Sequence, residues 1–108
     1  MPFKNRKMII YNITIKVEWT IAEEWVKWMQ EVHIPEVLNT GCFEKHQFVR
    51  LLQVDETEGP TYATQYYAPT LSKYDYYLQH FAQPLQRQIE DKWGDKYVDF
   101  RTLMQLVE

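Results

Sequence analysis

The sequence is poor in features that mark several large classes of protein. One cysteine in 108 residues excludes a disulfide within the chain, and we expect a cytoplasmic location. No apolar run is long enough to cross a membrane and no secretory leader is recognisable, so no membrane association is expected. The formal net charge of −3 argues against a nucleic-acid partner, which normally meets a basic surface.

Motifs of established chemistry are also missing. There is no glycine-rich phosphate loop, no Ser-His-Asp order and no recognisable pair of catalytic carboxylates. Cys42 and His46 share one side of a predicted strand and, with Glu36, His33 or His80, offer metal-ligand atoms. No CxxC or HxxxH pair anchors such a site, so we predict no metal and no cofactor.

Aromatic residues, in contrast, are abundant at 16% of the chain. Tyrosine and tryptophan favour half-buried surfaces such as sheet faces and subunit interfaces. A chain of this length buries only a modest core, so a partner subunit would add stability.

Residues 8–17 alternate as in a strand, with Ile9, Tyr11, Ile13, Ile15 and Val17 on the side expected to lie under helices. A helix is predicted to follow from residue 20.

A capping box of Thr20 and Glu23 is predicted to start this helix, and three of the four tryptophans lie in or beside it. Pro35 has no amide hydrogen and disfavours helical geometry at the preceding residue, so a kink or end is expected near His33. Gly41 is a natural stop.

The rest of the chain predicts strands over residues 42–54 and 61–68, joined as an antiparallel hairpin, and a last strand over 97–107. A second helix is expected over residues 69–93, interrupted at Pro84 and ended by Gly94. The order βαββαβ predicts an α+β, ferredoxin-like fold, a four-stranded antiparallel sheet with two helices on one face. We expect residues 1–7 to be a flexible arm and residues 8–108 to form a single domain.

The face without helices is expected to be too apolar for ordinary surface and too polar for a sealed core. Its predicted residues are Ile10, Asn12, Thr14, Phe48, Arg50, Ala63, Gln65, Tyr67, Arg101 and Leu103. Two such faces packed together would form a homodimer, the dimeric α+β barrel. A solvated open face is the alternative.

The segments IIYNITIKV, EEWVKWM, HIPEVLNTGCF, EGPTYATQY and DFRTLM resemble an uncharacterised bacterial family, a domain of unknown function with a ferredoxin-like, dimeric α+β-barrel fold. The resemblance covers residues 8–107 and implies a fold without a reaction. More distantly, Trp28 followed by His33-Ile34-Pro35 is similar to a helix-1 His-x-Pro pattern in α+β-barrel monooxygenases, isomerases and polyketide-type cyclases.

His33 is the candidate catalytic residue, because an imidazole at a helix break beside a cleft would act as a general acid or base near neutral pH. The alternative is a structural histidine that hydrogen-bonds a carbonyl freed around Pro35.

The candidate ligand-binding residues are Asn12, Trp28, Arg50, Gln65 and Arg101. The two arginines would bind a carboxylate or polar ring inside the barrel. Alternatively, they pair with Glu44, Asp99 or acidic groups of a second subunit.

Three functions follow from these patterns. The first is a homodimer that binds a small, partly apolar molecule between sheet and helices. The second is a cofactor-independent α+β-barrel enzyme, monooxygenase-, isomerase- or cyclase-like, with His33 as acid/base; a His33 sealed under Trp28 would argue against it. The third is a pure protein-interaction domain, which predicts no pocket.

Overall fold

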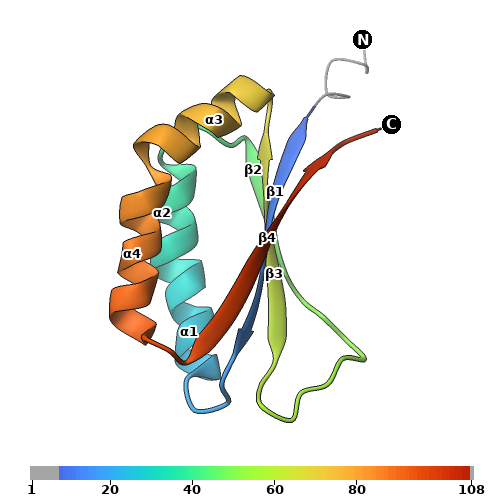
Figure 1. Ribbon diagram of the computed structural model, residues 1–108, viewed down its shortest axis with the longest axis vertical. Coiled ribbons are helices and arrows are strands. Elements are labelled where there is room, and N and C mark those ends of the chain that lie inside the picture. The colour runs from blue at the N-terminus through green and yellow to red at the C-terminus, as the bar shows by residue number, and fades with distance from the viewer. Residues whose placement is uncertain (1–7, 108) are drawn as a thin grey trace.

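The computed structural model describes residues 8–107, in which helices lie on one side of a four-stranded antiparallel sheet (Figure 1). The strands are β1 (Ile9–Val17), β2 (Lys45–Arg50), β3 (Thr61–Ala68) and β4 (Tyr97–Gln105), in the spatial order β2-β3-β1-β4. The first helical segment comprises α1 (Ala22–Trp28), a π-helical turn (Met29–His33) and α2 (Ile34–Leu38). The second comprises α3 (Leu71–His80) and α4 (Ala82–Trp93). The predicted ferredoxin-like fold is confirmed. The arm expected at residues 1–7 lies outside the described residues.

The central strand β1 sets the register of the sheet. Ile13 lies opposite Thr64 of β3 on one side and opposite Arg101 of β4 on the other. Residues directly opposite one another point to the same face, so these three side chains all lie under the helices. The predicted helix-facing set of β1 is confirmed, and four of its five members belong to the buried core.

Trp25 is the largest fully buried side chain and joins α1 to the sheet. Its ring centroid lies 5.9 Å from that of Phe48 and 5.2 Å from that of Tyr62, on β2 and β3. Truncating a buried tryptophan to alanine typically costs about 3–5 kcal/mol, so Trp25 contributes strongly to holding α1 on the sheet.

The prediction that Arg101 and Leu103 lie on the uncovered face is wrong. They pair with Ile13 and Tyr11, which are helix-facing residues of β1. The other side of β4 carries Val98, Phe100, Thr102 and Met104, so the more apolar half of this strand faces away from the helices. Backbone hydrogen bonds to β1 fix the register of β4. This register decides which side chains of the edge strand face the helices.

The same correction applies to Phe48 and Arg50. They lie opposite Thr64 and Tyr62 of β3, on the helix side of β2. The uncovered face therefore consists of Ile10, Asn12, Thr14, Lys16, Lys45, Gln47, Val49, Thr61, Ala63, Gln65, Tyr67, Val98, Phe100, Thr102 and Met104. β2 is also shorter than the predicted strand at residues 42–54. Cys42 and Phe43, at the start of that range, are instead buried in the core.

The start of the first helix differs from the predicted capping box. The N-cap is Ile21 and makes no side-chain cap, while the Thr20 hydroxyl donates to a Glu18 carboxylate oxygen at 3.4 Å. The tight turn before α1 supplies backbone bonds instead, with the amides of Ile21 and Ala22 donating to Glu18 and Trp19.

The break predicted near His33 is a π-helical turn, and the helix continues beyond it. Pro35 has no amide hydrogen, and in a regular α-helix its ring would crowd the carbonyl four residues earlier. One wider turn, in which the Ile34 amide donates to the Met29 carbonyl, accommodates the proline near the start of α2.

The second helix also divides near its proline. Phe81 separates α3 from α4 with a non-helical φ of −130°, and Pro84 occupies the first turn of α4, where its missing amide hydrogen costs nothing. Gly94, with a φ of 62°, ends α4 as predicted.

None of the helices described between residues 8 and 107 combines the length and apolarity needed to span a membrane.

The connection between β2 and β3, residues 51–60, extends away from the helices at one end of the sheet (Figure 1). The Arg50 guanidinium binds both carboxylate oxygens of Glu56 at 2.9 Å, and the Trp19 indole donates to the Glu56 carbonyl at 2.8 Å. Gly59 passes so close to the end of β1 that an added Cβ would lie 1.7 Å from the Val17 carbonyl oxygen.

We therefore expect Gly59→Ala to lower the free energy of unfolding by about 3 kcal/mol or more, because backbone blocks the new methyl group. The matched control is Gly94→Ala, which adds a methyl group to open space at positive φ and should cost about 1 kcal/mol. Urea denaturation of the three proteins measures both. If both substitutions lowered the free energy of unfolding equally, the close approach of Gly59 to the end of β1 would be contradicted.

Candidate functional site

A cavity of about 30 Å³ lies between the sheet and the helices. Three strands, the π-helical turn, α2, α3 and α4 all contribute to its wall. Its lining is Tyr11, Ile13, Ile15, Met29, His33, Val37, Thr64, Tyr66, Tyr77, Ala82, Gln86, Ile89 and Arg101. The volume admits roughly two water-sized groups.

The π-helical turn places His33 in this wall. The imidazole is only 7% exposed, and the Trp28 ring stacks on it with centroids 5.4 Å apart and planes at 21°. Trp28 in turn meets the Trp93 ring edge-on at 5.9 Å. His33 is therefore covered from the helix side and faces the cavity, and this cover argues against a freely accessible catalytic base.

Burial lowers the pKa of His33 to about 4, with a further contribution from the positive charge of Arg101. The imidazole is consequently neutral at pH 7. Its Nδ1 atom is buried without a hydrogen-bond partner among the described residues, so the expected bond to a freed carbonyl is not made at this atom.

Arg101 reaches the same cavity from β4. Its Nε donates to the Tyr11 hydroxyl at 2.8 Å, and its Nη1 lies 3.3 Å from the Asp99 carboxylate. Pairing with Asp99 was one of the two predicted alternatives for this residue. Arg101 lines the cavity from the edge strand, and 31% of its side chain stays exposed to solvent.

Two hydroxyl groups of β3 complete the polar part of the wall. Thr64 and Tyr66 are each 1% exposed, and neither hydroxyl has a hydrogen-bond partner within residues 8–107. Burial raises the pKa of Tyr66, so its hydroxyl stays protonated. Burial also raises the pKa of Tyr77, on the opposite wall. Three unpartnered polar groups from two elements thus meet at one small space.

The structure brings only some of the predicted site residues together. His33 and Arg101 line the cavity, and Trp28 covers His33. Asn12 and Gln65 lie opposite each other on the uncovered face, so the sheet separates them from the cavity.

Arg50 points towards the helix side of the sheet edge, but it is exposed and bound to Glu56, which is not among its predicted partners. The roles of Asn12, Gln65 and Arg50 in ligand binding stay predictions.

Sequence reasoning missed Thr64, Tyr66 and Gln86 as cavity residues. The available signal was weak: Thr64 is a polar residue at a position of β3 that shares its face with Tyr62, Tyr66 and Ala68. Alternation alone does not say whether such a hydroxyl is satisfied.

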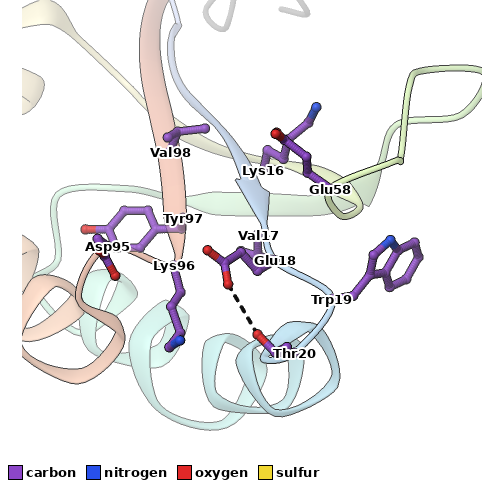
Figure 2. Close-up of a pocket in the computed structure, with 10 residues that line it drawn as sticks. All are labelled: Lys16, Val17, Glu18, Trp19, Thr20, Glu58, Asp95, Lys96, Tyr97 and Val98. Atoms are coloured by element: carbon purple, nitrogen blue, oxygen red, sulfur yellow. Dashed lines mark hydrogen bonds between the residues drawn. The ribbon is translucent and has the colours of Figure 1, made fainter.

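A larger hollow of about 410 Å³ lies at the end of β1, where Lys16, Glu18, Asp95 and Lys96 contribute to its lining. Figure 2 shows the Glu18 carboxylate directed at Thr20, with the Trp19 ring pointing away. The hollow is an open groove on the protein surface, and many of its lining side chains are charged. None of the buried, unpartnered polar atoms identified in residues 8–107 belongs to it. The smaller cavity is therefore the better candidate site.

The residues between 8 and 107 contain no group of three or more histidine, cysteine, aspartate or glutamate side chains arranged to hold a metal ion. Cys42 is buried as a free thiol, and His46 is exposed on β2.

The fold is that of ferredoxin-like α+β proteins. The sequence matches the family described as a domain of unknown function (DUF4286) over residues 8–107, and the chain belongs to that family. No curated protein matches the sequence significantly.

Solved structures share the fold at low sequence identity. A dimeric ferredoxin-like protein from an uncultured marine organism has a TM-score of 0.62 at 10% identity, covering 94% of this chain and 97% of that one. SnoaB, a cofactor-independent oxygenase from Streptomyces nogalater, has a TM-score of 0.65 at 10% identity, covering 91% of each chain. An ethyl tert-butyl ether d (EthD) family protein from Bacillus halodurans has a TM-score of 0.65 at 7% identity, covering 87% of this chain and 96% of that one.

The lowered pKa of His33 predicts a specific loss of stability in acid. The unfolded chain binds a proton near pH 6.5 and the folded chain only near pH 4, so stability falls as the pH drops through this window and levels off below it. The expected loss is about 3 kcal/mol, and His33→Gln should lack it. Urea denaturation from pH 7 to 3.5 measures the difference, with the exposed His80→Gln as control. If the free energies of unfolding of wild type and His33→Gln fell in parallel with pH, the lowered pKa of His33 would be contradicted.

The two unpartnered hydroxyls predict unusual stabilising substitutions. Tyr66→Phe and Thr64→Val each remove a buried donor that lacks a partner while keeping the shape of the side chain. Each should raise the free energy of unfolding by about 1 kcal/mol. Thermal and urea unfolding without added ligand check this. A loss of stability would mean that the hydroxyls are satisfied in solution.

Proposed function

We propose that this protein is a homodimer that binds a small, partly apolar molecule in the cavity beneath its helices. The observation that carries the proposal is the wall of that cavity, where buried and unpartnered polar groups of His33, Thr64 and Tyr66 lie among aromatic and aliphatic side chains. Ligand sites typically combine an apolar lining with a few convergent polar groups. A pure protein-interaction domain would not need a cavity lined by buried, unpartnered polar groups.

The size of the cavity limits what enters it. A space for roughly two water-sized groups accepts a very small molecule, or the polar end of a larger one. A larger ligand would have to displace side chains of α4 such as Gln86, which forms part of the cover.

The uncovered sheet face supports the homodimer. Its charged residues, Lys16 and Lys45, lie at the ends of their strands, and its interior is uncharged. Val98 and Phe100 are 67% and 62% exposed, which is a high exposure for neighbouring apolar side chains on one strand. Burying them against a second copy would remove this apolar area from water.

In such a dimer Asn12 and Gln65 would lie between the two sheets. The Asn12 amide donates to the Thr14 hydroxyl at 3.0 Å, and the Tyr67 hydroxyl donates to Gln65 at 3.4 Å, so the polar groups of this face partly satisfy one another. A semi-polar interface of this kind agrees with the dimeric state named for the marine ferredoxin-like protein. The expected cytoplasmic location is part of the same proposal.

Native mass spectrometry of protein from cells should detect a dimer that retains a small organic molecule. Phe100→Glu would place a charge in the proposed interface and should yield monomers. The matched control is Leu78→Glu, which changes a 42%-exposed leucine on α3 and should leave the dimer intact. A monomeric wild type, or equal behaviour of both variants, would refute the interface.

A second candidate is the cofactor-independent enzyme with His33 as acid/base, as in the cofactor-independent oxygenase class that SnoaB represents. The neutral, unpartnered imidazole nitrogen at the cavity favours it. The cover by Trp28 opposes it, which is why binding is the first proposal.

Proton abstraction by His33 has a direct test. NMR in D₂O would follow deuterium uptake at the central carbon of 2,4-pentanedione, an enolisable probe. An enzyme of this kind should accelerate exchange, and His33→Gln should lose the acceleration by about 10²-fold or more. His80→Gln, which changes an exposed histidine outside the cavity lining, serves as the control. Exchange at the buffer rate with wild type would leave binding as the function.

A further inference from the structure

Among formally charged residues, the wall of the cavity contains a cation and no anion. Arg101 is its only formally charged lining residue, and no aspartate or glutamate contributes to the wall. The Asp99 partner of Arg101 lies outside this lining. Arg101 also contributes to the lowered pKa of His33, which lines the same cavity, although burial is the larger cause.

The other polar groups of the wall are able to donate hydrogen bonds. The hydroxyls of Thr64 and Tyr66 are at least nine-tenths buried and have no acceptor among residues 8–107. A neutral imidazole donates from one nitrogen, and Nδ1 of His33 is buried without a partner. The guanidinium carries five donor hydrogens, of which the Nε–H goes to Tyr11.

An unpaired buried donor is costly, and an ionised oxygen is the acceptor that repays most of that cost. We propose that the cavity binds the charged oxygen of a small organic monoanion, a carboxylate, with Arg101 and the hydroxyls of Thr64 and Tyr66 as donors. This inference rests on the proposed small-molecule site and adds the chemical class of its ligand. Met29, Val37 and Ile89 would contact the apolar part of the carboxylate.

Acetate and acetamide form a matched pair of probes, because they share a shape and differ in charge. Titration of the ¹⁵N,¹³C-labelled protein by NMR would follow the Arg101 side-chain Nε–H and the His33 ring. Acetate should bind at least about tenfold more tightly than acetamide, the difference expected between charged and neutral hydrogen-bonded partners.

Variants locate the binding. Arg101→Gln should weaken acetate binding at least about tenfold, whereas Arg50→Gln, on the same face but outside the cavity lining, should stay within about twofold of wild type. Thr64→Val and Tyr66→Phe should weaken acetate binding while the proteins stay folded. They keep the test valid if Arg101→Gln fails to fold.

Several results would overturn the inference. Equal binding of acetate and acetamide would do so while leaving a small-molecule site in place. Unchanged acetate binding by Arg101→Gln, or by Thr64→Val and Tyr66→Phe, would place the anion elsewhere. No binding of acetate, with an uncharged molecule retained in native mass spectrometry, would refute only the anionic class. No binding of either probe and no retained molecule would refute the proposed function as well.

Discussion

The pairing of β1 with both β3 and β4 is the constraint on which the rest of the structure depends. Backbone hydrogen bonds on its two sides align Ile13 with Thr64 and with Arg101, and thereby choose which half of each neighbouring strand lies under the helices. A slip of one residue would send Arg101 to the uncovered face. It would also remove the charged side chain from the cavity. The composition of the candidate site is thus a consequence of register.

The helices pack on the face of the sheet that this register defines. Trp25 anchors α1 on Phe48 and Tyr62, and Pro35 forces a wider turn in the same helix. The turn leaves His33 beneath Trp28, facing the sheet. Leaving buried donors unpaired costs about 1–3 kcal/mol each, so the core must offset that cost unless a ligand does. Valine at position 64 and phenylalanine at position 66 would avoid that cost.

Much of the fold could be predicted from the sequence. The strand at residues 61–68 has the predicted bounds, Gly94 ends α4, and Pro35 lies beside the π-helical turn. The interruption predicted at Pro84 lies instead at Phe81, and Pro84 belongs to the first turn of α4. These features are local, because they arise from alternation, positive φ or a missing amide hydrogen. The capping box failed because Thr20 lies in a tight turn, where its hydroxyl bonds to Glu18.

The candidate site was only partly predictable. His33 and Arg101 were named separately from the sequence, but their meeting in one cavity depends on contacts between segments distant in the chain. By itself the sequence determined the order of elements, the apolar side of β1 and the irregular turn before Pro35, since each depends on neighbouring residues. Only the tertiary structure decided which face each edge strand presents. That choice depends on hydrogen bonds to another strand, and the mixed alternation of β2 and β4 is compatible with either face.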